Sequence, residues 1–124
     1  MSINRIATGF GLAAFFSLAV APTAFSQDAA AIARGDAKYQ HSCAPCHGDG
    51  PGDDGRQMLP GTDALRLKYR GELPALLEER SDLTPEVLRT FVRQGSMAMP
   101  PFRPTELTDD EIEDIAAYLA ESSR

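Results

Sequence analysis

The sequence predicts an all-α fold, and three observations indicate it. Apolar residues recur at three- and four-residue spacing in three segments, which is the period of one helix face. Residues that favour helix N-termini stand directly before these segments. No segment shows the alternation of apolar and polar residues that is typical of a strand, and no internal repeat is present. We therefore expect helices joined by loops, without a sheet.

The first helix is expected over residues 29–42. Ile32, Gly35 and Tyr39 share one face of it. Asp28 stands directly before it and supplies a side-chain oxygen that can cap the first free amide groups.

The second helix is expected over residues 85–94. Thr84 is the N-cap, and Pro85 takes a first-turn position where its missing N–H costs nothing. Gly95 follows directly, as glycine commonly does at a helix C-terminus.

The third helix has the strongest start signal, because residues 108–111 form the Thr-x-x-Glu capping box. Its apolar stripe consists of Ile112, Ile115, Ala116 and Leu119. A shorter helix is expected over residues 74–80. The remaining segments are expected to be loops, including the glycine-rich stretch of residues 48–61.

Residues 1–26 have the layout of a secretory signal peptide. Arg5 supplies a positive charge, residues 6–20 form an apolar run, and the small residues Ala24 and Ser26 precede a cleavage position. The run is shorter than the ~20 residues that span a bilayer as a helix. We therefore expect cleavage, and a periplasmic mature domain of residues 27–124 without a membrane span.

The expected mature domain is acidic. Removing residues 1–26 from the 124-residue chain leaves 98 residues with 11 basic and 18 acidic side chains, a formal charge of −7. This charge argues against binding to nucleic acid, whose phosphates would repel it. Free cysteines are unusual in an oxidising compartment, so a disulfide, a metal or a covalent cofactor is expected to occupy Cys43 and Cys46.

All cysteines and histidines of the chain lie in the segment HSCAPCHGDG: His41, Cys43, Cys46 and His47. A thioredoxin-like pair would follow a strand in a βαβ unit, and a structural zinc site needs four ligands, usually as two separated pairs. A disulfide within this segment would close a very small loop and stabilise little. The pattern Cys-x-x-Cys-His instead indicates covalent attachment of one haem c, with Cys43 and Cys46 bound to its vinyl groups and His47 as an iron ligand.

The other iron ligand decides the function. His41 is too near His47 in sequence, which leaves the methionines Met58, Met97 and Met99. Met99 is favoured because Pro100 and Pro101 stiffen the chain after it, and Met97 is the less favoured substitute. Methionine ligation predicts an electron carrier rather than an enzyme. An open position would instead predict a haem enzyme or gas sensor, and a protein without haem would be a thiol–disulfide oxidoreductase.

Three stretches, GDAKYQHSCAPCHGDG, FVRQGSMAMPPF and LTDDEIEDIAAYL, resemble the class I c-type cytochromes along nearly the whole expected mature chain. The resemblance implies a small cytochrome c fold wrapped around one haem, with His47 and Met99 as axial ligands. It also implies that Gly35 and Tyr39 pack against the last helix, at Ile115 and Tyr118.

More narrowly, the tail MPPFRPTELTDDEI resembles the small cytochrome subunits of flavin-dependent phenol-oxidising dehydrogenases, of the p-cresol methylhydroxylase or eugenol hydroxylase type. That resemblance implies a flavoprotein dehydrogenase as the redox protein partner, whereas the alternative is a free electron carrier with other redox protein partners. The apolar residues expected around an exposed haem edge are Ala44, Pro45, Pro100, Pro101 and Phe102. The candidates for contact with the haem propionates are Arg56, Arg66, Lys68 and Tyr69, and either the acidic last helix or a basic run of Arg66, Lys68 and Arg70 could steer docking.

Overall fold

The computed structural model describes residues 28–124, so the expected signal peptide lies outside the described part of the chain. The helices are α1 (Ala29–Ser42), α2 (Ala44–His47), α3 (Pro60–Tyr69), the 3-10 helix η1 (Leu77–Glu79), α4 (Pro85–Gln94) and α5 (Asp109–Ser122). Within residues 28–124 the only β-type pairing is an isolated bridge between Ser96 and Met99. The all-α prediction is therefore confirmed.

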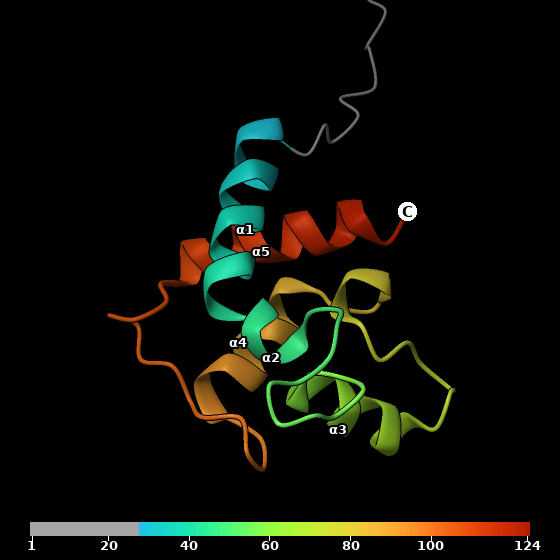
Figure 1. Cartoon of the computed structure of the whole chain (residues 1–124). Coiled ribbons are helices and arrows are strands. Elements are labelled where there is room, and N and C mark those ends of the chain that lie inside the picture. The colour runs from blue at the N-terminus through green and yellow to red at the C-terminus, as the bar shows by residue number, and fades with distance from the viewer. Residues whose placement is uncertain (1–27) are drawn as a thin grey trace, which may run out of the picture.

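The crossing of α1 over α5 organises the core (Figure 1). Gly35 allows the two helix backbones to meet, because a Cβ built there would lie 2.0 Å from the carbonyl oxygen of Asp114. One turn later the rings of Tyr39 and Tyr118 pack with their centroids 5.3 Å apart. The pairing expected of Gly35 and Tyr39 with α5 is thus confirmed. The fully buried side chains of this core are Tyr39, Leu107, Ile112 and Leu119.

The expected caps are present. The side chain of Thr108 accepts from the backbone N–H of Glu111, and the Glu111 carboxylate accepts from the backbone N–H of Thr108. Thr84 accepts from the N–H of Val87 at the start of α4. These bonds satisfy amide groups that a helix leaves free at its N-terminus, so local sequence suffices to start α4 and α5.

The prediction that residues 60–69 belong to a loop was wrong, since they form α3. The start of α3 was hidden because Leu59, its N-cap residue, provides no side-chain capping bond and Pro60-Gly61 is typical of a turn. The expected loop of residues 48–61 accordingly ends at Leu59. The short helix expected over residues 74–80 is present only as the single turn of η1.

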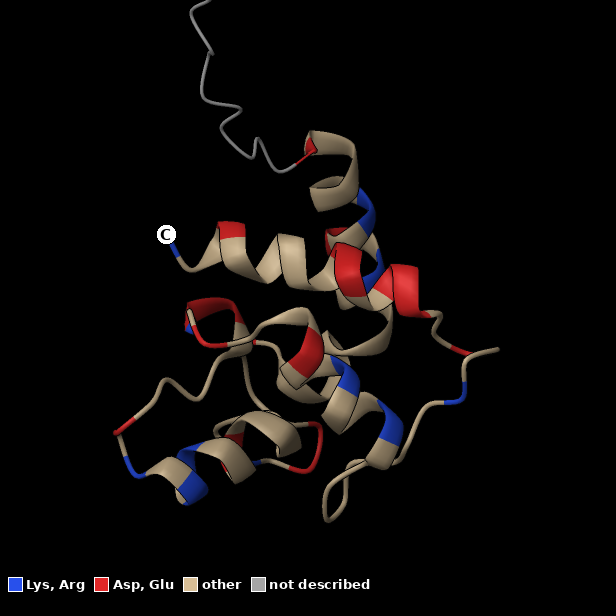
Figure 2. Cartoon of the chain, turned by 180° about the vertical axis from the view of Figure 1, so that it is seen from behind, with Lys and Arg blue, Asp and Glu red and all other residues tan. Residues whose placement is uncertain are grey.

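No helix among residues 28–124 is long and apolar enough to cross a membrane. Charge is spread unevenly over these helices (Figure 2). Acidic residues occupy the first turn of α5, and the basic residues Arg66 and Lys68 lie in the last turn of α3.

Candidate functional site

The two cysteines and His47 lie on one tight turn at the end of α1. The N–H of Cys43 donates to Tyr39 at 2.8 Å and so closes α1. The carbonyl of Cys43 then accepts from the N–H groups of Cys46 at 3.0 Å and His47 at 2.9 Å. This turn is α2, with Cys43 as its N-cap. The three side chains of the motif therefore lie within five consecutive residues on one helical turn.

The thiols differ in their surroundings, and no disulfide joins them. Cys43 is half-buried and packs against the hydrophobic core, whereas Cys46 is exposed. Burial, and secondarily the nearby Cys46, raises the pKa of Cys43 to about 11. A redox-active pair needs a lowered thiol pKa and sits in a βαβ unit, whereas Cys43 is shifted upward and residues 28–124 contain no strand. The site therefore disfavours a thiol–disulfide oxidoreductase.

The His47 ring is held against the start of α3. A Cβ built on Gly61 would lie 2.7 Å from Cε1 and 2.8 Å from Nδ1 of this ring, so only glycine leaves the necessary space. The α3 residue Thr62 donates from its hydroxyl to the carbonyl of Gly48 at 2.9 Å. Tyr39 donates to the carbonyl of His47 at 3.3 Å. Three elements thus position the backbone and ring of one histidine.

His47 has the chemistry of a metal ligand. Burial lowers its pKa, which favours the neutral imidazole at neutral pH. Its Nδ1 is buried without a hydrogen-bond partner. Among residues 28–124 no group of three or more His, Cys, Asp or Glu side chains is placed to hold a metal ion. A neutral histidine beside two cysteines that do not pair with each other fits a covalently attached haem, because that group brings its own four nitrogen ligands and needs only axial donors from the protein.

Met99 and Met97 point to different surroundings in the segment after α4. Backbone hydrogen bonds of 3.0 Å and 2.9 Å join Ser96 and Met99 and form a tight turn. Met97 stands at its tip with a positive φ of 54° and a fully exposed side chain. Met99 is half-buried and packs against the hydrophobic core. The structure therefore separates the two candidates, and Met99 is the one turned toward the protein interior.

Gly95 makes this turn possible. Its φ is +69°, a conformation that side chains rarely adopt, and a Cβ there would lie 2.7 Å from the carbonyl oxygen of Met99. The residue stops α4 and reverses the chain so that Met99 comes back alongside the helix end.

Met58, the third candidate, is half-buried and lines a surface depression of about 570 Å³ with Arg56 and Arg66. Neither His47 nor Met99 lines this depression. Both arginines are already engaged in ion pairs, Arg56 with Asp54 at 3.0 Å and Arg66 with Asp63 at 2.7 Å.

Arg80 is a buried cation that the sequence did not single out. Its side chain is 6% exposed and pairs with both carboxylate oxygens of Asp82, at 2.9 Å and 2.5 Å. Its guanidinium also lies 4.8 Å from the ring centroid of Tyr69. The only sequence signal was the Arg-x-Asp spacing, which is too common to reveal burial.

With this geometry in place, comparison with known proteins identifies the family. Residues 30–119 match the family described as cytochrome c oxidase, cbb3-type, subunit III. The chain belongs to this family of c-type cytochrome domains. A cytochrome c6 from Cyanidioschyzon merolae is 33% identical over 91 residues, which cover 73% of this chain and 74% of the relative. No solved structure matches the chain significantly.

As a c-type cytochrome, the protein carries covalently bound haem c and functions in electron transfer. The predicted cofactor and the all-α cytochrome c fold are confirmed.

Proposed function

We propose that the protein is a class I mono-haem cytochrome in which Cys43 and Cys46 form the thioether bonds to haem, and His47 and Met99 are the axial iron ligands. The observation that carries this proposal is the contrast between the two nearby methionines. Met97 is fully exposed, whereas Met99 is half-buried and packs against the core. A sulfur held within the protein is the one suited to bind an iron that the protein encloses.

Bound haem supplies a one-electron Fe(III)/Fe(II) couple, and the protein determines how that couple behaves. A thioether opposite histidine raises the reduction potential relative to two histidines. The two side chains are held independently. Gly61 and the α2 turn confine the His47 ring, while the bridge to Ser96 confines the Met99 backbone. Rigid placement of both ligands keeps reorganisation small on reduction and favours electron transfer over chemistry at the iron.

The test is the near-infrared sulfur-to-iron charge-transfer band of the oxidised holoprotein. Met99→Ala is expected to abolish this band. Met97→Ala is the matched control, because it removes a thioether two residues away from a fully exposed position, and it should leave the band unchanged. Loss of the band in Met97→Ala alone would transfer the role to Met97. A wild-type protein without the band that rapidly binds carbon monoxide or cyanide would be an open-site haem enzyme or sensor.

Covalent attachment has a separate test. Haem should stay with the wild-type protein through acid–acetone extraction, because two thioether bonds hold it. A single Cys46→Ala substitution should leave one bond and shift the reduced α-band to longer wavelength, because one vinyl group stays unsaturated. Haem that is fully extracted from the wild type would contradict the assignment of Cys43 and Cys46.

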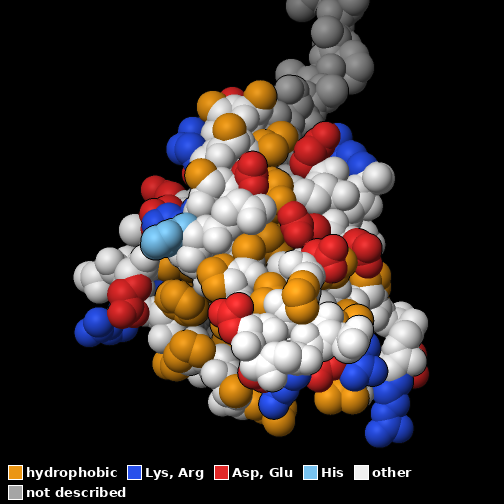
Figure 3. Space-filling model, viewed as in Figure 1, with side chains coloured by type: hydrophobic (Ala, Val, Ile, Leu, Met, Phe, Trp, Pro, Cys, Tyr) orange, Lys and Arg blue, Asp and Glu red, His pale blue; other side chains and the backbone are white. Residues whose placement is uncertain are grey.

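A redox protein partner fits the surface around the Met99 turn. A depression of about 430 Å³ is lined by Lys38, His41, Ser42, Pro100, Pro101, Phe102 and Glu106. Figure 3 shows apolar side chains at the lower left of the molecule, interspersed with polar and charged ones. Pro45, Pro100 and Pro101 are exposed, as an apolar contact area for a transient partner requires.

For that partner we favour a flavoprotein dehydrogenase, on the resemblance of the MPPFRPTELTDDEI tail to the cytochrome subunits of such enzymes. Rapid reduction of the oxidised cytochrome by a flavoprotein encoded beside it, in the presence of a phenolic substrate, would support this assignment. A flavoprotein that reduces small dyes but not this cytochrome would contradict it.

The export of the protein remains a proposal of its own. Cleavage after residue 26 would deliver the domain of residues 27–124 to the periplasm. The mature N-terminus should be Gln27 in protein from the periplasmic fraction. Intact residues 1–26 in the haem-loaded protein would contradict the proposed cleavage.

A further inference from the structure

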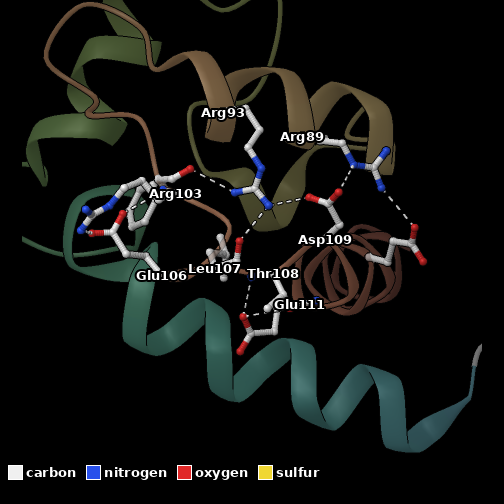
Figure 4. A network of polar contacts seen from close by, with 10 residues as sticks. Arg89, Arg93, Arg103, Glu106, Leu107, Thr108, Asp109 and Glu111 are labelled. Carbon is white, nitrogen blue, oxygen red and sulfur yellow. Dashed lines mark hydrogen bonds and ion pairs between the residues drawn. The ribbon is translucent and has the colours of Figure 1, made fainter.

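Arg93, in the last turn of α4, binds three acceptors around the segment that carries Met99 (Figure 4). Its guanidinium donates to the carbonyl of Phe102 at 3.0 Å and to that of Leu107 at 2.8 Å. It also pairs with the Asp109 carboxylate at 2.5 Å. The three acceptors belong to the segment between Met99 and α5 or to the first residue of α5.

These contacts hold the C-terminal part of the Met99 segment, residues 95–107, against α4. At the near side Gly95 ends α4, and the N–H of Phe102 donates to the carbonyl of Val92 at 2.8 Å. Leu107, at the other end, is 1% exposed and anchored in the core. The chain from Gly95 to Leu107 is therefore a loop with both ends pinned near the end of α4, and one side chain, Arg93, bonds to two of its carbonyls.

We propose that Arg93 is a positioning residue for Met99. By holding the backbone of residues 102–107 against α4, it keeps the Met99 sulfur at the iron and slows its replacement by other ligands. This inference rests on the proposed function, in which Met99 is the axial ligand.

The arrangement requires arginine in particular. A guanidinium presents five N–H donors in a planar fork, so it can reach two carbonyls and a carboxylate at once. Lysine would offer a single ammonium group on a flexible stem and would keep at most part of this set. Hydrogen bonds from a charged group are also stronger than neutral ones.

Arg89, one turn earlier on α4, provides a matched control. It faces the same acidic helix, with Nε 3.7 Å from Asp109 and a terminal nitrogen 3.1 Å from Glu113. Among the described residues it makes no hydrogen bond to a carbonyl of the Met99 segment. Arg89→Ala therefore removes a comparable charge and its ion pairs without releasing that segment.

The experiment measures imidazole binding to the oxidised holoprotein by its visible spectrum, well below the unfolding temperature. Imidazole must displace the methionine sulfur, so its apparent affinity rises with the fraction of protein in which that sulfur is released. We expect about a tenfold higher affinity in Arg93→Ala, equivalent to ~1.4 kcal/mol. Arg93→Lys should give a smaller rise and serves if the alanine variant cannot be obtained loaded with haem. Arg89→Ala should change the affinity less than about twofold, since it frees no loop carbonyl.

A double-mutant cycle with Met99→Ala separates positioning from a general loss of stability. If Arg93 acts through the sulfur, its substitution should not change imidazole affinity in the Met99→Ala background. A rise of equal size in both backgrounds, or unchanged affinity in the Arg93 single variants, would overturn the proposal. If Met99→Ala retains the near-infrared sulfur band, the proposed ligand itself is wrong, which is a distinct outcome and removes the basis of the inference as well.

Discussion

Replacing Gly35 by alanine tests the helix crossing on which the core depends. In a helix without tertiary contacts this change would stabilise the protein by up to ~1 kcal/mol, because alanine has the higher helix propensity. Here the new Cβ would stand 2.0 Å from the carbonyl oxygen and 2.5 Å from the carbonyl carbon of Asp114, and 3.0 Å from the backbone nitrogen of Ile115. The obstacle is backbone, which cannot rotate away as a side chain could. The contact with α5 thus predicts a lower free energy of unfolding for Gly35→Ala, whereas helix propensity alone predicts a higher one.

The magnitude follows from how far α1 and α5 must separate. A Cβ–oxygen contact below about 3.0 Å is essentially never seen, so the 2.0 Å contact requires a shift of about 1 Å. A gap of 0.5–1 Å forfeits roughly a quarter to a half of the dispersion energy of the atoms that face it. Overpacking typically costs about 1–3 kcal/mol and sometimes more. We take the upper end of this cost, about 3 kcal/mol, because the obstacle is backbone. After a propensity gain of about 1 kcal/mol we expect a net loss of about 2 kcal/mol, or ~8–16 °C in Tm for a domain of this size.

Thermal and urea unfolding of the oxidised holoprotein, followed by far-UV circular dichroism, would measure this loss. Ala37→Gly, at an exposed position of the same helix, is the control. It should cost about 1 kcal/mol through propensity alone. A Gly35→Ala variant as stable as the wild type, or more stable, would refute the reasoning that the α1–α5 contact requires glycine.

Three further predictions concern other contacts. Thr108→Ala should lower the free energy of unfolding by about 1 kcal/mol in urea titrations, because it removes the side-chain bond of the capping box. Gly61→Ala should perturb the visible spectrum of the holoprotein and destabilise it, since a Cβ would lie 2.7 Å from Cε1 of His47. Burial and the hydrogen bond to Glu78 raise the pKa of Tyr118 from 10.0 to about 12. Folded protein therefore keeps a proton that unfolded protein loses, so stability should fall between pH 10 and about 12, and less steeply in Tyr118→Phe.

The substitutions of Thr108 and Gly61 each have a matched control variant. Thr105→Ala removes an exposed threonine that caps no helix and should leave stability nearly unchanged. Ala64→Gly lowers the helix propensity of α3 at an exposed position and should leave the visible spectrum as it was. An unaltered visible spectrum in Gly61→Ala would contradict the argument about the His47 ring. A free energy of unfolding that falls equally steeply above pH 10 in Tyr118→Phe and in the wild type would contradict the argument about Tyr118.

The helices with local start signals were predictable, and the one without them was not. The expected bounds of α1 and α4 agree with the structure, and α5 begins where its capping box predicts. These helices carry a side chain that bonds their own first turn, which is a short-range interaction. Helix α3 has no such bond at Leu59. Its start is held by tertiary contacts, of Gly61 with the His47 ring of α2 and of Thr62 with the carbonyl of Gly48, and no local pattern reveals contacts of that kind.

The sequence by itself determined the chemistry of the site, because spacing within a few residues suffices for it. Two thiols and a histidine in Cys43-x-x-Cys46-His47 predict covalent haem, and the family comparison confirms that cofactor. Tertiary structure alone decided which methionine turns inward, that Gly61 confines the His47 ring, and that Arg93 binds the Met99 segment. Each of these depends on chain reversals that bring distant backbone groups within contact distance. Such contacts follow from packing of the whole core, and no local sequence pattern predicts them.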